Sequence, residues 1–207
     1  MSNITLYRHP LSGHSHRVEV FLSLLGLDST LVNVDLANGE HQQPEFLAKN
    51  IFAEVPVLED GAVTLADSNA ILVYLASQYD HSRTWYPINP VAAAEVQRFL
   101  SIAAGPVAYG PAAARLVNVF GAELNHAQTI EQSHQLFNQL EQHLAKRTWL
   151  ANDDPTIADV ANYTYIAHAV EGSVSLQNYP NIRAWINRFE QLQGFIPMQT
   201  TVVGCAA

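Results

Sequence analysis

Strand patterns occur only in the first 80 residues of the chain, whereas the apolar patterns beyond residue 90 have a helical period. ITLY alternates as a short strand, HPLSG interrupts it, and a helical apolar stripe begins near Gly13 and ends at a left-handed cap on Gly26. The run LVNVDL at residues 31–36 predicts a second strand and completes a βαβ unit. The chain therefore combines an α/β first half with an all-α second half.

The first half continues with four more elements. The loop ANGEHQQPEFLAKN carries a short helix that begins near Pro44, where proline is tolerated in a first turn. VPVL and AVTL flank a turn at Glu59-Asp60-Gly61 and predict a tight hairpin. ADSNAILVYLASQY predicts a helix with Asp67 or Ser68 as its cap. The predicted order over residues 1–80 is βαβαββα.

The second half is predicted to be a helical bundle. Residues 81–89 are polar and contain a proline, so they form the predicted linker, and residues 90–207 form the second domain. A long helix begins at Pro90, and two Gly-Pro pairs should kink or divide it. Further helices are predicted over about residues 126–146, from Thr156 and after Pro180.

Composition limits the partners. The net charge of −9 leaves no basic stripe to neutralise a phosphate backbone, so nucleic acid is not an expected partner. The start of the chain has no apolar signal core, and no apolar run approaches the roughly 20 residues that span a bilayer, so we expect a cytoplasmic protein without membrane contact. The single cysteine, Cys205, permits no internal disulfide and no thiol pair for redox exchange.

Val55-Pro56 lies at the start of a predicted strand, where proline cannot donate a ladder hydrogen bond. A cis peptide here would turn the backbone of Val55 outward, where it could pair with an extended peptide ligand. Most X-Pro bonds are trans, so these two residues alone favour a trans bond.

Polar residues precede two of the predicted helices. Ser12 lies just before the first helix, and from spacing alone the better interpretation is a helix cap. Asp67-Ser68 is either a plain capping pair or a site for a carboxylate and an ammonium group. His14 and His16 point to different helix faces, so zinc is not expected. Arg17 either adds to the local positive field or faces solvent.

Four motifs in register resemble the glutathione transferase family: LYRHPLSGHSHRVEVFLSLLGL, GEHQQPEFLAKN, EVPVLEDG and LADSNAILVYLA. The resemblance covers essentially the whole chain, and its first quarter is most similar to the serine-type classes, phi-like and zeta-like. It implies a thioredoxin-like first domain with a cis-proline loop, and a two-fold homodimer. It also implies glutathione as co-substrate, with no metal.

The resemblance also implies roles for individual residues. Ser12 would donate a hydrogen bond to the glutathione thiolate beside a helix N-terminus, and Ser15 or a backbone amide is the alternative. Glutathione would be bound by His41, Gln42, Glu54, Val55, Pro56, Asp67 and Ser68. Gln42 replaces a frequent lysine and Glu54 a frequent glutamine, and these departures bear on affinity. A second-substrate pocket would involve His14, Phe99, Tyr109 and Arg115, although an aromatic such as Tyr109 is more often a core residue.

The function that these observations favour is an enzyme in which bound glutathione, as thiolate, attacks a small hydrophobic electrophile by conjugation, with peroxide reduction as a further possibility. The alternative is a non-catalytic module of the same fold that binds ligands or proteins. Thr156-Ile157-Ala158-Asp159 is a capping box of the second domain and is assigned a structural role.

Overall fold

A computed structural model describes residues 4–203 of the chain; Cys205 lies outside the described residues. The chain divides into two compact units. Unit 1 contains the residues up to His81 together with Leu192–Gln199, and unit 2 contains the remainder. The second domain predicted from the sequence included 192–199, and here the structure differs. His16 contacts the backbone carbonyl of Ile196, with 2.9 Å between its Nε2 and that oxygen, which attaches this late segment to unit 1.

Unit 1 has the predicted order of strands and helices. Its elements are β1 (Ile4–Arg8), α1 (Gly13–Leu24), β2 (Ser29–Asn33), η1 (Glu40–Gln42), α2 (Pro44–Leu47), β3 (Val57–Asp60), β4 (Val63–Ala66) and α3 (Ser68–Tyr79). Gly26 follows α1 at a φ of 66°, the left-handed conformation predicted for that cap. The short η1 turn was not predicted, and β2 begins and ends earlier than the predicted strand.

The four strands form one mixed sheet in the order β2-β1-β3-β4. β1 and β2 are parallel, as the predicted βαβ unit requires, whereas β3 is antiparallel to both of its neighbours. The hairpin turn is Gly61-Ala62 rather than the predicted Glu59-Asp60-Gly61. Glu59 and Asp60 remain in β3 because they pair with β4 and accept hydrogen bonds from the hydroxyls of Tyr7 and Tyr74, at 2.9 Å each.

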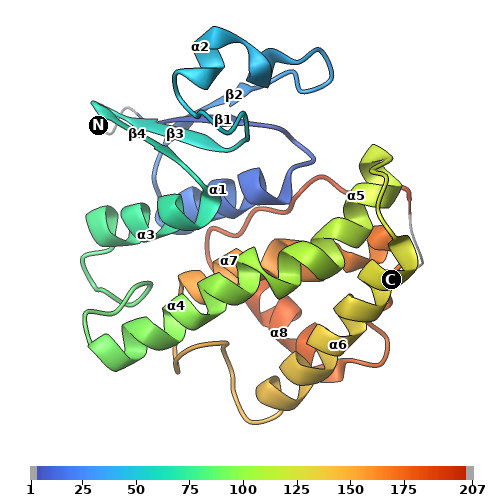
Figure 1. Cartoon of the computed structure of the whole chain (residues 1–207). Coiled ribbons are helices and arrows are strands. Elements are labelled where there is room, and N and C mark those ends of the chain that lie inside the picture. Colours follow the sequence, from blue (N-terminus) through green and yellow to red (C-terminus); the bar gives the residue numbers. More distant parts are fainter. Residues whose placement is uncertain (1–3, 204–207) are drawn as a thin grey trace. The chain divides into compact units, whose positions relative to one another are not determined.

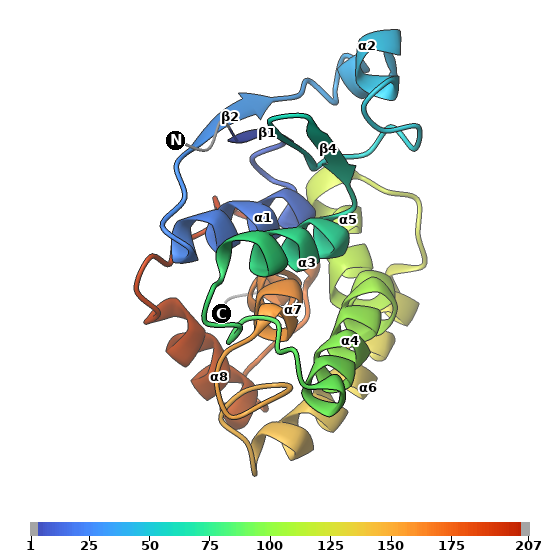
Figure 2. The same cartoon turned by 90° about the vertical axis from the view of Figure 1, so that its left-hand side faces the viewer.

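Both faces of the sheet are covered, which gives unit 1 two apolar layers. Ile4 and Leu6 alternate inward along β1 and are almost fully buried. α1 and α3 lie side by side on one face, and the α2 segment lies on the other (Figures 1 and 2). Phe46 of α2 packs on that second face in a cluster with Val34 and Val57.

The regular elements of unit 2 within residues 4–203 are all helices. Its helices are α4 (Pro90–Ala104), the short π-helix η2 (Ala108–Ala112), α5 (Ala113–Phe120), α6 (His126–Leu144), α7 (Ile157–Ala167), the 3₁₀ helix η3 (Ala169–Gly172) and α8 (Pro180–Glu190). The two Gly-Pro pairs do divide the long stretch from Pro90, because α4 ends before Gly105 and Pro111 lies inside η2.

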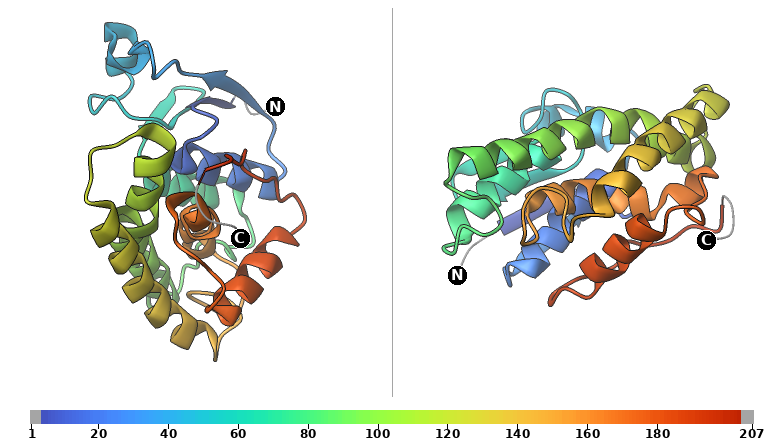
Figure 3. Two further views of the ribbon diagram at one scale, coloured as in Figure 1. Left: turned by 90° about the vertical axis from the view of Figure 1, so that its right-hand side faces the viewer. Right: turned by 90° about the horizontal axis from the view of Figure 1, so that it is seen from below.

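The core of unit 2 forms around α7. All residues from Ile157 to Ile166 are buried, and α7 contacts both α4 and α8 (Figure 3). Thr156 and Asp159 form the predicted capping box, which leaves the first turn of this buried helix with its backbone donors satisfied. None of the helices in the described residues is long and apolar enough to cross a membrane.

Candidate active site

The register of the sheet brings four of the predicted segments to one end of unit 1. Tyr7 pairs with Val57, Val57 pairs with Ala66, and Arg8 pairs with Asn33 of the parallel strand β2. The loop after β1, the Val55-Pro56 segment before β3, the start of α3 after β4 and the turn after β2 therefore all leave the sheet at this end. Each of these segments carries predicted glutathione-site residues.

Ser12 is the N-cap of α1. Its backbone is extended, with a φ of −83° and a ψ of 117°, and its Oγ accepts a hydrogen bond from the backbone N–H of Ser15 at 3.2 Å. The capping interpretation of Ser12 is thus confirmed, and its side chain remains partly exposed. Ser15 is fully buried, and its hydroxyl accepts a hydrogen bond from the backbone N–H of His9 at 3.3 Å. Of the two serines, Ser12 is the accessible one.

Asp67 and Ser68 begin α3, as predicted. Asp67 has a φ of 70°, a conformation that costs energy for a residue with a Cβ. It caps the helix, because its Oδ1 accepts a hydrogen bond from the Ala70 N–H at 2.8 Å, and its side chain is exposed. Ser68 is only 2% exposed, and its hydroxyl faces α1.

His14 lies in the glutathione-site half of the chain and contacts Ser68, with 3.0 Å between its Nδ1 and the Ser68 Oγ. The sequence assigned His14 to the second-substrate pocket, so this contact was not expected. Arg17 is fully buried, which corrects the solvent-facing alternative, and its Nη1 lies 3.0 Å from His14 Nδ1 and 3.1 Å from Ser68 Oγ. Burial, followed by the nearby Arg17 cation, lowers the pKa of His14 to about 3.

The Val55-Pro56 bond is cis, the geometry that the resemblance implied. The loop before it is held by Asn50, whose side-chain amide donates a hydrogen bond to the Glu54 carbonyl at 2.9 Å. Pro56 is buried, whereas Glu54 is exposed at the end of the sheet.

His41 and Gln42 lie in η1, after β2. Gln42 is exposed, and its amide nitrogen is 3.5 Å from His41 Nε2. The Nδ1 atom of His41 is buried and has no hydrogen-bond partner within residues 4–203. Nearby in the sequence, Lys49 pairs with Glu59 and lies 4.7 Å from the centre of the Tyr7 ring, and the hydrogen bond with Glu59 raises the pKa of Lys49. Sequence reasoning did not single out this cluster.

The residues predicted for the second-substrate pocket in the helical half differ in their surroundings. Tyr109 is 67% exposed, so the core interpretation of this aromatic is wrong. Phe99 is 2% exposed, and its ring packs against His143 with 5.3 Å between centroids, so it is a core residue of unit 2. Arg115 is 1% exposed and pairs with Glu171, its Nε lying 2.5 Å from Oε2. Phe99 and Arg115 therefore do not form a pocket rim.

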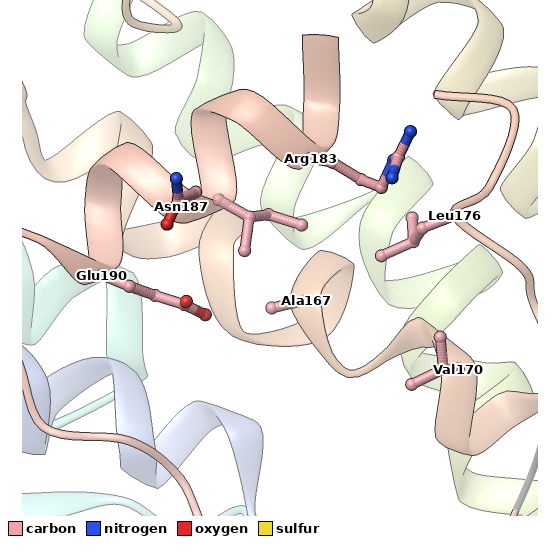
Figure 4. Close-up of a pocket in the computed structure, with 7 residues that line it drawn as sticks. Ala167, Val170, Leu176, Arg183, Asn187 and Glu190 are labelled. Carbon is pink, nitrogen blue, oxygen red and sulfur yellow. The ribbon is translucent and has the colours of Figure 1, made fainter. Parts of the chain in front are cut away.

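Unit 2 also has a cavity of about 300 Å³ that none of the predicted residues line. Its lining comes from the end of α7, η3, the following loop and α8 (Figure 4), namely Ala167, Val170, Leu176, Arg183, Ile186, Asn187 and Glu190. Among the residues that the structure describes, no group of three or more His, Cys, Asp or Glu side chains is placed to hold a metal ion. His14 faces Ser68 while His16 faces the Ile196 carbonyl, so the two histidines do point apart.

Two family models match the chain: the glutathione S-transferase N-terminal domain over residues 2–77 and the C-terminal domain over residues 114–193. Glutathione S-transferase 3 of Zea mays is 34% identical over 200 residues, which cover 89% of this chain and 88% of that relative. Glutathione S-transferase theta-2 of Rattus norvegicus is 30% identical over 203 residues, which cover 92% of this chain and 82% of that relative.

Solved structures agree with these relatives. A glutathione S-transferase from Pseudomonas fluorescens has a TM-score of 0.89 at 28% identity, with 95% of this chain and 99% of that chain covered. A glutathione transferase homologue from Drosophila mojavensis, with bound glutathione, has a TM-score of 0.84 at 31% identity, with 93% and 89% covered. Known glutathione transferases thus match this chain over nearly its whole length. This chain belongs to the glutathione S-transferase family.

Proposed function

We propose that this chain binds glutathione at the end of the unit 1 sheet and holds its thiol as a thiolate beside Ser12, for attack on small hydrophobic electrophiles. Family membership carries the enzyme class, glutathione transferase, and the co-substrate. The observation that supports Ser12 most strongly is its position: a partly exposed hydroxyl at the N-terminus of a 12-residue helix. The serine-type class remains a prediction.

The chemistry depends on the charge of the sulfur. A free thiol has a pKa of about 8.5, so most of it is protonated at neutral pH. A hydrogen bond from the Ser12 hydroxyl and the positive end of α1 both favour the anion. Lowering the thiol pKa by roughly two units makes the thiolate, which is the nucleophile, the main species at neutral pH.

Both ends of glutathione have proposed partners in unit 1. At the γ-glutamyl end, the exposed Asp67 carboxylate offers a partner to the ammonium group, and Ser68 offers a hydroxyl to the carboxylate. At the glycine end, the unpartnered Nδ1 of His41 supports a contact with the second carboxylate. The backbone of Val55 is the proposed partner of the peptide part, with Pro56, Gln42 and Glu54 around it.

Titration of the bound thiol tests the role of Ser12. We expect the ultraviolet absorbance of enzyme-bound glutathione to report a depressed thiol pKa, and Ser12→Ala to raise this pKa by about one to two units, the worth of a hydrogen bond to a charged group. Ser15→Ala is the matched control, because Ser15 is buried and should leave the titration unchanged. A rise in Ser15→Ala but not in Ser12→Ala would transfer the role to Ser15, and no rise in either would favour a backbone amide.

The electrophile is held, in this proposal, by a surface that includes the exposed Tyr109. Conjugation, peroxide reduction and related reactions all begin from the same thiolate, so the acceptor surface chooses among them. A panel of aryl halides, peroxides and α,β-unsaturated carbonyls measures that choice. Binding of glutathione without turnover of any member would contradict the proposed enzyme.

We also propose that the chain forms a cytoplasmic homodimer. The loop that Asn50 holds in place displays two apolar side chains, Ile51 at 79% and Phe52 at 75% exposure. Adjacent exposed apolar side chains of this size are typical of interaction surfaces, and a two-fold interface lets one patch serve both subunits.

Phe52→Ser tests this interface. Because the substitution removes an exposed aromatic side chain without disturbing the unit 1 core, we expect a shift from dimer toward monomer in sedimentation equilibrium, with the fold retained in circular dichroism. Ile88→Ser is the matched control, since Ile88 is 78% exposed and lies elsewhere in the chain. Dissociation by Ile88→Ser alone would place the interface away from Phe52.

A further inference from the structure

Three polar side chains join α1 to α3 at the start of both helices. His14 and Arg17 come from successive turns of α1, and Ser68 is the first residue of α3. The three atoms that meet, His14 Nδ1, Arg17 Nη1 and Ser68 Oγ, lie 3.0 to 3.1 Å from one another. Each of the three atoms is therefore within hydrogen-bond distance of the other two. This geometry restricts which of the three groups can donate and which can accept.

The Arg17 guanidinium fixes the state of the histidine. A guanidinium can only donate hydrogen bonds, so the His14 Nδ1 beside it must accept. An accepting Nδ1 carries no proton, which makes His14 the neutral tautomer with its proton on Nε2. The low pKa of His14, about 3, agrees with a ring that stays neutral next to a buried cation.

The same geometry fixes the Ser68 hydroxyl. Its oxygen accepts a hydrogen bond from Arg17, and its single proton needs an acceptor. His14 Nδ1, 3.0 Å from the Ser68 Oγ, is placed to accept the hydrogen bond of that proton. The hydroxyl of an almost fully buried serine is thus satisfied in the unliganded protein, and its one proton is already in use.

We propose that His14 is the resting-state acceptor of the Ser68 hydroxyl, and that the γ-glutamyl carboxylate of glutathione displaces it by taking over that proton's hydrogen bond. This inference rests on the proposed function, in which Ser68 meets that carboxylate. On binding, the hydroxyl rotates, Ser68 Oγ still accepts from Arg17, and His14 Nδ1 keeps Arg17 as its donor. His14 does not touch the substrate, so it is a positioning residue that lowers glutathione affinity while it keeps the empty site ordered.

Calorimetric titration of two ligands tests the exchange. The ligands are glutathione and 4-aminobutanoyl-cysteinylglycine, the same molecule without the γ-glutamyl carboxylate. His14→Leu removes the competing acceptor, so we expect glutathione to bind about fivefold more tightly, the worth of roughly one hydrogen bond, while binding of the analogue is unchanged. The empty His14→Leu protein should unfold at a lower temperature, because its Ser68 proton has lost its acceptor.

His14→Asn is the matched control. Its side-chain oxygen lies at the δ position, where it can replace Nδ1 as acceptor, so we expect wild-type affinity for both ligands. Unchanged or weaker glutathione binding in His14→Leu, with the wild type still preferring glutathione over the analogue, would overturn this inference alone. A wild type that binds the two ligands equally would overturn the Ser68 carboxylate contact and this inference with it.

Nitrogen NMR of the wild-type protein tests the same exchange and does not depend on whether His14→Leu folds. With ¹⁵N-labelled histidine, assigned through His14→Asn, the His14 Nδ1 signal should be that of an unprotonated acceptor at neutral pH. Glutathione should shift the Nδ1 signal in the direction that indicates a weaker hydrogen bond to this nitrogen, and the analogue should leave the signal unchanged. A protonated Nδ1, or a signal that glutathione does not move, refutes the exchange.

Discussion

Gly172 is the glycine of unit 2 at which an added Cβ would meet the closest neighbouring atoms. A Cβ built there would lie 2.6 Å from the backbone nitrogen of Arg115 and 2.7 Å from the carbonyl carbon of Ala114. Because these are backbone atoms of α5, they cannot rotate away, so we expect Gly172→Ala to lower the free energy of unfolding by about 3 kcal/mol in urea titration.

Gly26→Ala is the comparison for Gly172→Ala. Gly26 has a positive φ but open space around its missing Cβ, so only the left-handed conformation is penalised, at about 1 kcal/mol. Equal losses in the two variants would show that η3 moves aside from α5, and that the close approach at Gly172 is not fixed.

Single residues were predictable from the sequence where their role is local. Ser12 and Asp67 precede helices, and a cap needs only a short polar side chain at that position. The burial of Arg17 and the contact of His14 with Ser68 were not predictable, because they depend on which face of α1 packs against α3. The catalytic and binding roles of the site residues stay predictions.

At the scale of elements, the start of α7 is held in place by several hydrogen bonds to one buried carboxylate. The Asp159 carboxylate accepts from the backbone N–H groups of Leu150 and Thr156 and from the Trp185 indole N–H, at 2.9 to 3.0 Å. Asp159→Asn replaces an accepting oxygen with a donor, so buried donors lose their partner. We expect a loss of about 2 kcal/mol or more in the free energy of unfolding, measured in urea.

Thr156→Ser is the matched control for the capping box. Serine keeps the hydroxyl that accepts from the Ala158 N–H at 3.2 Å, so we expect only the small loss that comes from the missing methyl group. If Asp159→Asn were no more destabilising than Thr156→Ser, the hydrogen bonds to this carboxylate would not secure α7.

Most helices and strands were predictable because their signals are periodic. The 2-residue and 3.6-residue patterns depend on burial of one face, which the sequence carries directly. Phe99 and Arg115 were assigned to the second-substrate pocket because the helical apolar period shows that a face is buried but not whether it lines a pocket. Arg115 is buried because Glu171, 56 residues away in the sequence, supplies its counter-charge. An ion pair between residues this far apart cannot be predicted from the local sequence.

At the scale of the whole chain, Glu171 connects distant parts of unit 2. Its carboxylate accepts hydrogen bonds from Arg115 of α5 and from the backbone N–H of Thr201, and it faces His168. Burial opposes the charge, but the donors from Thr201, His168 and Arg115 outweigh it and lower the pKa of Glu171.

A lowered folded-state pKa means that the unfolded chain binds the Glu171 proton first as pH falls. The stabilisation is therefore complete above the unfolded value of about 4.3 and is lost as pH drops through the folded value. We expect Glu171→Gln to reduce stability at neutral pH and to flatten the acid limb of urea-derived stability against pH. Glu95→Gln is the matched control, because Glu95 forms an exposed pair with Arg98; it should change neither the stability at neutral pH nor the acid limb. An acid limb as steep in Glu171→Gln as in the wild type would contradict the role assigned to Glu171.

The return of Leu192–Gln199 to unit 1 has a consequence for dividing this protein. A single cut between His81 and Ser82 does not yield two self-sufficient pieces, because the longer fragment still carries eight residues of the shorter one's fold. The shorter fragment also loses the Ile196 carbonyl that His16 contacts. Exchanging either unit with that of a homologue therefore requires three junctions in the swapped gene, after residues 81, 191 and 199.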